Sequence, residues 1–195
     1  MRRALVALML VMLAASARAE VLSLEVGGEV DPPPGWITFC QGFSAQCTAP
    51  PTQPRSITYS SAVWTVMRRI NAKVNNMVKP KTDLEHWGVS ERWGYPDDGF
   101  GDCEDYVLEK KRQLVRAGLP PEALLITVVK DTDGNGHAVL TVPTNKGDFI
   151  LDNKNRMIVL WHETPYKFRK RQSQYHPNMW VSLADPRHPL FTGGH

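Results

Sequence analysis

The stretch GFGDCEDYVLEKKRQL, residues 99–114, contains a cysteine at the point where a glycine-rich loop gives way to a helix. Tyr106 and Leu114 follow Cys103 at helical spacing, so these three side chains share one face of the helix. Gly118 stands where a glycine commonly follows the C-cap of a helix, ahead of two prolines. We therefore predict a helix that begins at about Cys103 and turns its first residues inward.

A longer helix is expected upstream, over residues 60–78. Val63, Ile70 and Val74 belong to an apolar stripe at helical spacing, and Pro80 ends the pattern. Together the two helices provide an apolar surface large enough to cover one face of a sheet.

Downstream of residue 120 the apolar pattern changes to alternation and β-branched residues, which is typical of strands. Short turn-forming stretches separate the apolar segments, as in an antiparallel meander. The expected strands are residues 123–130, 137–144, 147–153 and 156–161. Helices followed by antiparallel strands predict an α+β fold, with the helices packed on an antiparallel β-sheet.

The first turn in this region, DTDGNG at residues 131–136, matches the first half of an EF-hand calcium loop. The twelfth position of such a loop should be a bidentate Glu, but here it is Val142, inside an expected strand. We therefore interpret the stretch as a hairpin turn that delivers His137.

Residues 1–19 have a basic start, a short apolar run and an Ala-Arg-Ala cleavage pattern, which together predict a secretory signal peptide. The apolar run is shorter than the roughly 20 residues that a membrane span needs, and no second candidate follows in the mature chain. Removal of this segment takes away three of the 23 basic residues and none of the 20 acidic ones, so the mature chain has no net charge. The charge therefore gives no support for nucleic-acid binding.

Export places the chain where disulfides persist, and the sequence contains three cysteines. Cys40 and Cys47 lie close together in a stretch rich in Pro, Gly and Ser, and we expect them to be bridged. On this basis residues 20–56 form an irregular arm with a Cys40–Cys47 disulfide, and residues 57–195 form the main domain. Cys103 then remains as a free thiol that needs an explanation.

A nucleophilic cysteine needs an imidazole base, and the imidazole needs an acceptor that fixes its tautomer. His137 begins an expected strand, and Asp152 lies near the end of the next one. If residues 145–146 form a two-residue turn, Asp152 pairs with Val139 and lies diagonal to His137, about 7–8 Å away at the backbone. A turn at residues 144–145 would instead place Asp152 directly opposite His137. In both registers the carboxylate can approach the ring.

Three motifs closely resemble the bacterial transglutaminase-like cysteine proteinases: GDCEDYVLEKKRQLVRAGLP, GHAVLTV and FILDNKNRMIVLW. The resemblance extends from about Trp64 to Trp180. It implies a papain-like or transglutaminase-like core in which Cys103 is the nucleophile, His137 the general base and acid, and Asp152 the orienting carboxylate.

The same resemblance implies a periplasmic cysteine endopeptidase with a protein substrate. A large surface adhesin as that substrate, and an inner-membrane regulatory receptor as a partner, are further implications. Two other functions stay open at this point: a transglutaminase or amidase acting on Gln or cell-wall peptides, and a non-catalytic binding module of the same fold.

The acidic residues Asp102, Glu104 and Asp105 surround Cys103 and should oppose its ionisation. A bound divalent cation would reverse the sign of their field, and carboxylate oxygens suit Ca²⁺. The family resemblance implies calcium dependence through the same residues, so we predict a calcium site formed by Asp102, Glu104 and Asp105. The alternative is that these acids only cap the helix, because its N-terminus favours negative charge.

Overall fold

The computed structural model describes residues 23–188. The signal peptide expected over residues 1–19 lies outside this range. The helices are α1 (Pro34–Gly42), α2 (Ser61–Met77), α3 (Asp83–Trp87) and α4 (Cys103–Arg116), with 3-10 turns η1 (Ser44–Gln46), η2 (Pro121–Ala123) and η3 (Trp161–Glu163). The strands are β1 (Glu25–Val30), β2 (Lys79–Pro80), β3 (Phe100–Gly101), β4 (Leu125–Lys130), β5 (Gly136–Thr144), β6 (Gly147–Leu151), β7 (Val159–Leu160), β8 (Lys167–Gln172) and β9 (Trp180–Ala184).

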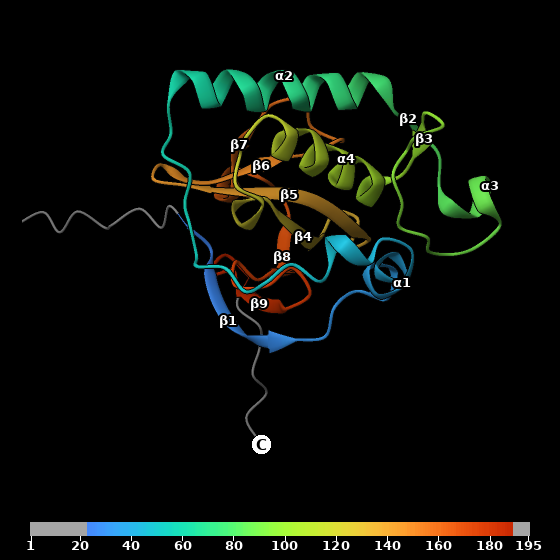
Figure 1. Cartoon of the computed structure of the whole chain (residues 1–195), viewed down its shortest axis with the longest axis horizontal. Helices are drawn as coiled ribbons and strands as arrows, with labels where there is room; N and C mark the ends of the chain where they lie inside the picture. The colour runs from blue at the N-terminus through green and yellow to red at the C-terminus, as the bar shows by residue number, and fades with distance from the viewer. Residues whose placement is uncertain (1–22, 189–195) are drawn as a thin grey trace, which may run out of the picture.

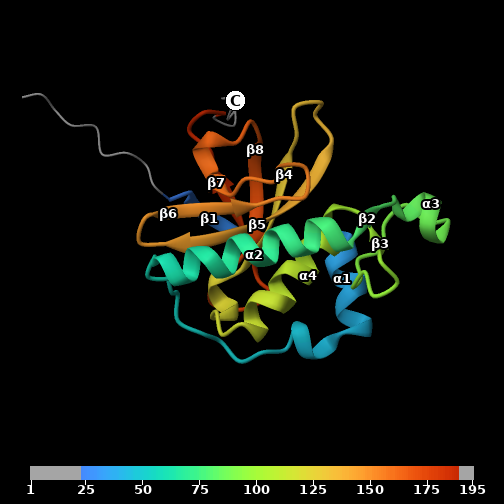
Figure 2. The ribbon, with the colours of Figure 1, turned by 90° about the horizontal axis from the view of Figure 1, so that it is seen from above.

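The fold is a seven-stranded antiparallel sheet with helices packed on it, in the strand order β1-β9-β8-β4-β5-β6-β7. Figure 1 shows α4 between α2 and the sheet, and Figure 2 shows α2 crossing above α4 and β5. Met67 and Val74 of α2, Leu114 of α4 and Leu140 of β5 are fully buried in the resulting core. The α+β class predicted from the sequence is confirmed.

The two predicted helices are present with nearly the expected bounds. Ser60 is the N-cap of α2, where its side chain accepts a hydrogen bond from the amide of Val63. At the C-terminal end of α4, Ala117 is the C-cap and Gly118 has a φ of 93°, a conformation that glycine adopts without strain. Cys103 is the first residue of α4, as the sequence predicts.

The predicted meander from β4 to β7 is also confirmed, but its strands make up only part of the seven-stranded sheet. Strands β8, β9 and β1 complete it, and the sequence analysis did not predict them. The basic run at residues 167–171 belongs to β8, where Arg171 is buried and forms an ion pair of 3.1 Å with Asp148. The run of cations hides the strand pattern of β8, because one of them, Arg171, faces inward.

Residues 20–56 were expected to form an irregular arm, but the described part of this range contains a strand, a helix and a 3-10 turn. β1 pairs with β9 at the edge of the main sheet, and α1 inserts Trp36 into the core. These contacts join segments far apart in the chain, so no local pattern predicts them. The Cys40–Cys47 disulfide is present, with a Cα–Cα distance of 5.8 Å, and it ties the end of α1 to the segment that follows. Within residues 23–188, none of the helices has the length and apolar character needed to cross a bilayer.

Candidate active site

Cys103 is half-buried at the N-terminus of α4, where that helix meets β5. Burial raises the pKa of its thiol well above the usual value, and the neighbouring Glu104 carboxylate raises it further. The thiol donates a hydrogen bond to Glu104 Oε2, at 3.1 Å from Sγ. A hydrogen bond from the backbone of Ala138 acts in the opposite direction on the thiol pKa. The sulfur of Cys103 therefore lies against β5 at the residue next to His137.

His137 of β5 and Asp152, the residue directly after β6, form a buried pair with 2.9 Å between His137 Nε2 and Asp152 Oδ1. β5 and β6 pair Leu140 with Leu151 and Thr144 with Gly147, which is the register of a turn at residues 145–146. The first of the two predicted registers is therefore confirmed, and Asp152 follows directly after β6.

The second ring nitrogen of His137, Nδ1, is buried and has no hydrogen-bond partner among the described residues. An ionised carboxylate only accepts hydrogen bonds, so Asp152 places the proton of a neutral imidazole on Nε2. This tautomer leaves a lone pair on Nδ1. The arrangement gives His137 one fixed nitrogen and one nitrogen that can accept a proton.

Asp152 is held by further hydrogen bonds that the sequence analysis did not anticipate. Tyr166 Oη donates to its Oδ2 at 2.5 Å, and the amide of Lys154 donates to its Oδ1 at 3.0 Å. Burial raises the pKa of Asp152, but the hydrogen bonds from His137 and Tyr166 outweigh it and hold the pKa below its ordinary value. Asn75 of α2 also donates to the backbone carbonyl of Asp152, at 2.8 Å. Tyr166 lies just before β8, in a region without a recognisable local signal.

Two of the three predicted metal-binding acids lie together, and a third acid joins them from another element. Carboxylate oxygens of Asp83, Asp102 and Glu104 lie within 4.8 Å of one another. Asp83 is the first residue of α3, and the sequence does not indicate its role because it lies 20 residues before Cys103 in the chain. The short parallel pairing of β2 with β3 joins the segment leading to α3 to the start of α4.

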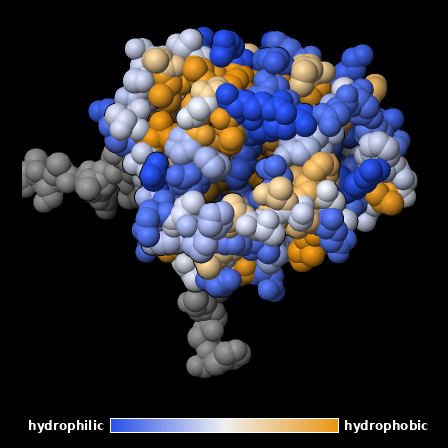
Figure 3. All heavy atoms as spheres, in the orientation of Figure 1, coloured by the Kyte–Doolittle hydropathy of each residue, from blue (hydrophilic) through white to orange (hydrophobic). Residues whose placement is uncertain are grey.

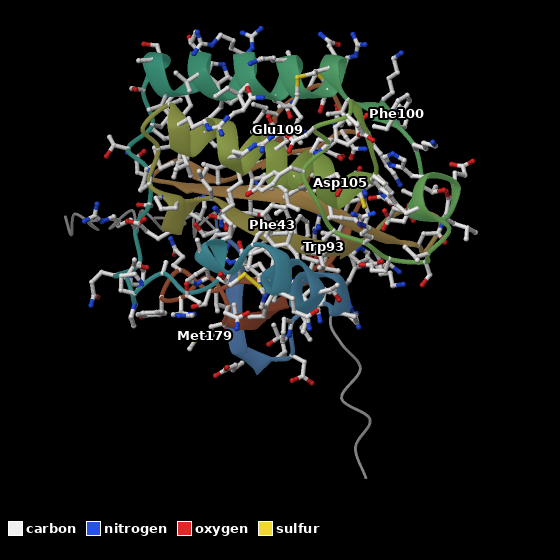
Figure 4. All side chains as sticks on the ribbon, turned by 45° about the vertical axis from the view of Figure 1, so that its right-hand side comes forward. Phe43, Trp93, Phe100, Asp105, Glu109 and Met179 are labelled. Atoms are coloured by element: carbon white, nitrogen blue, oxygen red, sulfur yellow. A yellow bond between two sulfur atoms is a disulfide. The ribbon has the colours of Figure 1, made fainter. Side chains whose placement is uncertain are left out.

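Asp105 occupies a different position from the other two predicted acids. Its Oδ1 accepts a hydrogen bond of 2.9 Å from the amide of Gly94, and burial raises its pKa to about 7. A Cβ at Gly101 would come within 2.6 Å of Asp105 Oδ2, so only glycine allows this close approach. Figure 4 shows Asp105 at the end of α4 that faces the loop carrying Trp93. In this structure Asp105 anchors that loop and lies outside the three-carboxylate group.

The three-carboxylate group of Asp83, Asp102 and Glu104 has the chemistry of a site for a hard divalent cation. Asp102 is the N-cap of α4, yet its side chain makes no capping hydrogen bond, and its buried Oδ1 has no hydrogen-bond partner among the described residues. Burial, together with the charge of Asp102, raises the pKa of Glu104 to about 9. Helix capping therefore does not account for Asp102, and a cation would satisfy its free oxygen.

The EF-hand-like stretch DTDGNG forms a hairpin turn that leads into β5, as predicted. Asp131 Oδ1 accepts hydrogen bonds from the amides of Asp133 and Asn135, and its Oδ2 forms an ion pair of 2.8 Å with Lys154. The oxygens of Asp131 are thus used within the protein. Since the amide of Lys154 also binds Asp152, this turn helps to position the His137–Asp152 pair.

A thiol at a helix N-terminus, packed beside a buried His–Asp pair on an antiparallel sheet, defines a cysteine hydrolase with a papain-like or transglutaminase-like core. The chain matches the family described as bacterial transglutaminase-like cysteine proteinase over residues 26–188, and it belongs to that family. The enzyme class is therefore that of a cysteine proteinase.

Solved structures with a similar fold include LapG from Legionella pneumophila. One such structure is 22% identical, with a TM-score of 0.52, and the match covers 74% of this chain and 76% of that one. A calcium-bound form of the same protein is 21% identical, with a TM-score of 0.53 and 80% of each chain covered. An EGTA-treated form is 24% identical, with a TM-score of 0.52 over 77% of this chain and 76% of that one. No curated protein matched the chain in a sequence search.

Proposed function

We propose that this proteinase is an exported endopeptidase in which Cys103 is the nucleophile, His137 the general base and acid, and Asp152 the residue that orients His137. The observation that carries the proposal is the buried Nδ1 of His137, which has no hydrogen-bond partner among the described residues. His137 precedes Ala138, whose backbone forms a hydrogen bond with the Cys103 thiol. The other ring nitrogen of His137, Nε2, is hydrogen-bonded to Asp152, so Nδ1 is the atom available to take the proton of the thiol.

The reaction then follows from these positions. His137 Nδ1 accepts the thiol proton, and Cys103 Sγ attacks the carbonyl carbon of a peptide bond. The same nitrogen returns the proton to the leaving amine, which departs and leaves a thioester on Cys103. Water, deprotonated by His137, attacks the thioester and releases the new carboxyl end with the free thiol. In this proposal, backbone amides at the N-terminus of α4 stabilise the negative oxygen of each tetrahedral intermediate.

We further propose that Asp83, Asp102 and Glu104 bind a calcium ion. When bound, the ion supplies positive charge that offsets the carboxylates beside the thiol. Without such charge, Glu104 and the burial of Cys103 both oppose thiolate formation. The calcium-bound LapG structure supports this assignment, since that protein has a similar fold.

The proposed location is the periplasm, and the proposed substrate is an exported or surface protein such as a large adhesin, with an inner-membrane receptor as regulator. A disulfide between Cys40 and Cys47 fits an oxidising compartment.

To test for endopeptidase activity, the purified protein is incubated in calcium with a mixture of unstructured peptides, and the products are measured by mass spectrometry. New peptide termini that are absent with the matched Cys103→Ala variant would support an endopeptidase. Release of ammonia or formation of isopeptide links without new termini would show a transglutaminase or amidase instead. Unchanged peptides in both samples would count against catalysis.

A further inference from the structure

A cavity of about 430 Å³ lies between α1, α4 and the start of β4, away from the catalytic side chains. Its inner walls are apolar: Trp36 comes from α1, Leu108 from α4, and Leu125 and Ile126 from β4. On the face drawn in Figure 3, the surface is hollowed below α4. The volume falls within the range of about 300–1,000 Å³ that is typical of small-molecule sites.

The mouth of the cavity is formed by the segment that follows α1. Ala45, Gln46 and Ala49 lie at this edge, and the Cys40–Cys47 disulfide fixes the segment against α1. Figure 4 shows Phe43 between α1 and α4 in that view, and its ring stacks on Phe39 at 4.7 Å between centroids. Covalent and aromatic contacts therefore hold the mouth in place, and the site is formed before any ligand enters.

One amine lies in the wall of this apolar cavity. Lys111 Nζ donates a hydrogen bond to Gln172 Oε1 at 2.8 Å, and no ion pair of Lys111 is present among the described residues. An ammonium has three donors, so this contact leaves donors without a described acceptor. Burial lowers the pKa of Lys111 to about 7, and no charged neighbour among residues 23–188 compensates for it.

The other charged groups at the cavity do not supply the missing negative charge. Glu122 is in the lining, but its carboxylate lies 3.4 Å from the guanidinium of Arg55. Arg112 is held by Asp97 at 2.6 Å. Arg116 lines the cavity and adds a further positive charge. The cavity thus combines apolar walls with an excess of positive charge.

We propose that this cavity binds a small amphiphilic anion, with a single alkyl chain against the apolar walls and a carboxylate on Lys111. The alkyl chain gains from burial against the aromatic and aliphatic side chains. The carboxylate accepts the remaining hydrogen bonds of the ammonium and supplies its counter-charge, which favours the protonated amine. The described lining includes none of the proposed catalytic or calcium-binding residues, so this proposal does not depend on the proposed function.

Octanoate and 1-octanol are suitable probes, because they share an alkyl chain and differ in charge. Isothermal titration at pH 7 should show octanoate binding at least about tenfold more tightly than octanol, the scale of one charge-assisted hydrogen bond. In Lys111→Met the two affinities should become equal, and Lys111→Gln should behave in the same way. Ile126→Trp, which fills the cavity, should abolish both.

Lys110→Met provides the matched control, because it removes the preceding lysine of α4, which is also buried but is not in the cavity lining. This variant should keep the preference for octanoate. Thermal unfolding of each variant shows whether it is folded. Equal binding of the two probes to the wild type, a preference that survives both Lys111 variants, or no binding of either probe would each overturn the proposal.

Discussion

Lys110 of α4 is a buried amine whose removal should stabilise the protein. Its side chain has no exposed surface, and its Nζ has no hydrogen-bond partner among the described residues. The ring of Tyr106 is 6.0 Å from Nζ, which is at the limit of a cation–π contact. Burial lowers the pKa of Lys110 to about 7, although the negative charge of Asp152 acts in the other direction.

The magnitude and its pH dependence follow from this pKa. An unfolded lysine titrates near 10.4, so the folded pKa is lower by about three units, each equivalent to about 1.4 kcal/mol. Between pH 7 and pH 10 the unfolded chain binds more protons than the folded one, so the free energy of unfolding rises with pH across this window. The upper limit of the cost at pH 7 is about 4 kcal/mol, and relaxation around the amine reduces it. We expect Lys110→Met to raise the free energy of unfolding by about 2 kcal/mol at pH 7.

Urea unfolding at pH 7 and pH 9.5 measures this effect, with Lys146→Met as a control at an exposed position. The gain from Lys110→Met should be smaller at pH 9.5, because there the wild-type amine is neutral in the folded state. The control should change the free energy of unfolding by less than about 0.5 kcal/mol. Destabilisation by Lys110→Met at pH 7, or an equal effect at both pH values, would show that the buried amine does not cost stability.

Three other test variants, one of them a double substitution, probe separate parts of the structure. Asp83→Asn should abolish the rise in melting temperature that calcium causes, while Asp133→Asn in the exposed hairpin turn should preserve it; equal shifts would count against the calcium site. Tyr166→Phe removes a hydrogen bond to Asp152 and should lower kcat/KM about tenfold with little change in KM, and an unchanged kcat/KM would contradict this role. Replacing Cys40 and Cys47 together by Ser should lower the free energy of unfolding by about 2–3 kcal/mol in denaturant titrations, as expected for a short closed loop. No loss of stability would show that the bridge does not constrain the unfolded chain.

The parts of the fold that the sequence predicts are those with local signals. The apolar stripes and caps of α2 and α4, and the two-residue turn between β5 and β6, depend on neighbours within a few residues. The same turn fixes the register that brings His137 to Asp152. The thiol could be placed beside them because Cys103 begins a helix that packs on β5.

The parts that the sequence does not predict depend on contacts between distant segments. β1 forms a strand only because it pairs with β9, which lies more than 140 residues later in the chain. Asp83 and Tyr166 reach the site from α3 and from the segment before β8, and nothing in their local sequence indicates a partner. The free Oδ1 of Asp102 is also a property of the folded structure alone, since an Asp at an N-cap normally predicts capping.

The rate of Cys103 alkylation by iodoacetamide in calcium at pH 7 shows whether His137 activates the thiol. Cys103 is the free cysteine of the described chain, because Cys40 and Cys47 are bridged. If His137 Nδ1 takes the thiol proton, the wild type should react at least about 100-fold faster than His137→Ala, the lower end of general-base effects. Equal rates in the two proteins would contradict the account, because Cys103 would then ionise without His137.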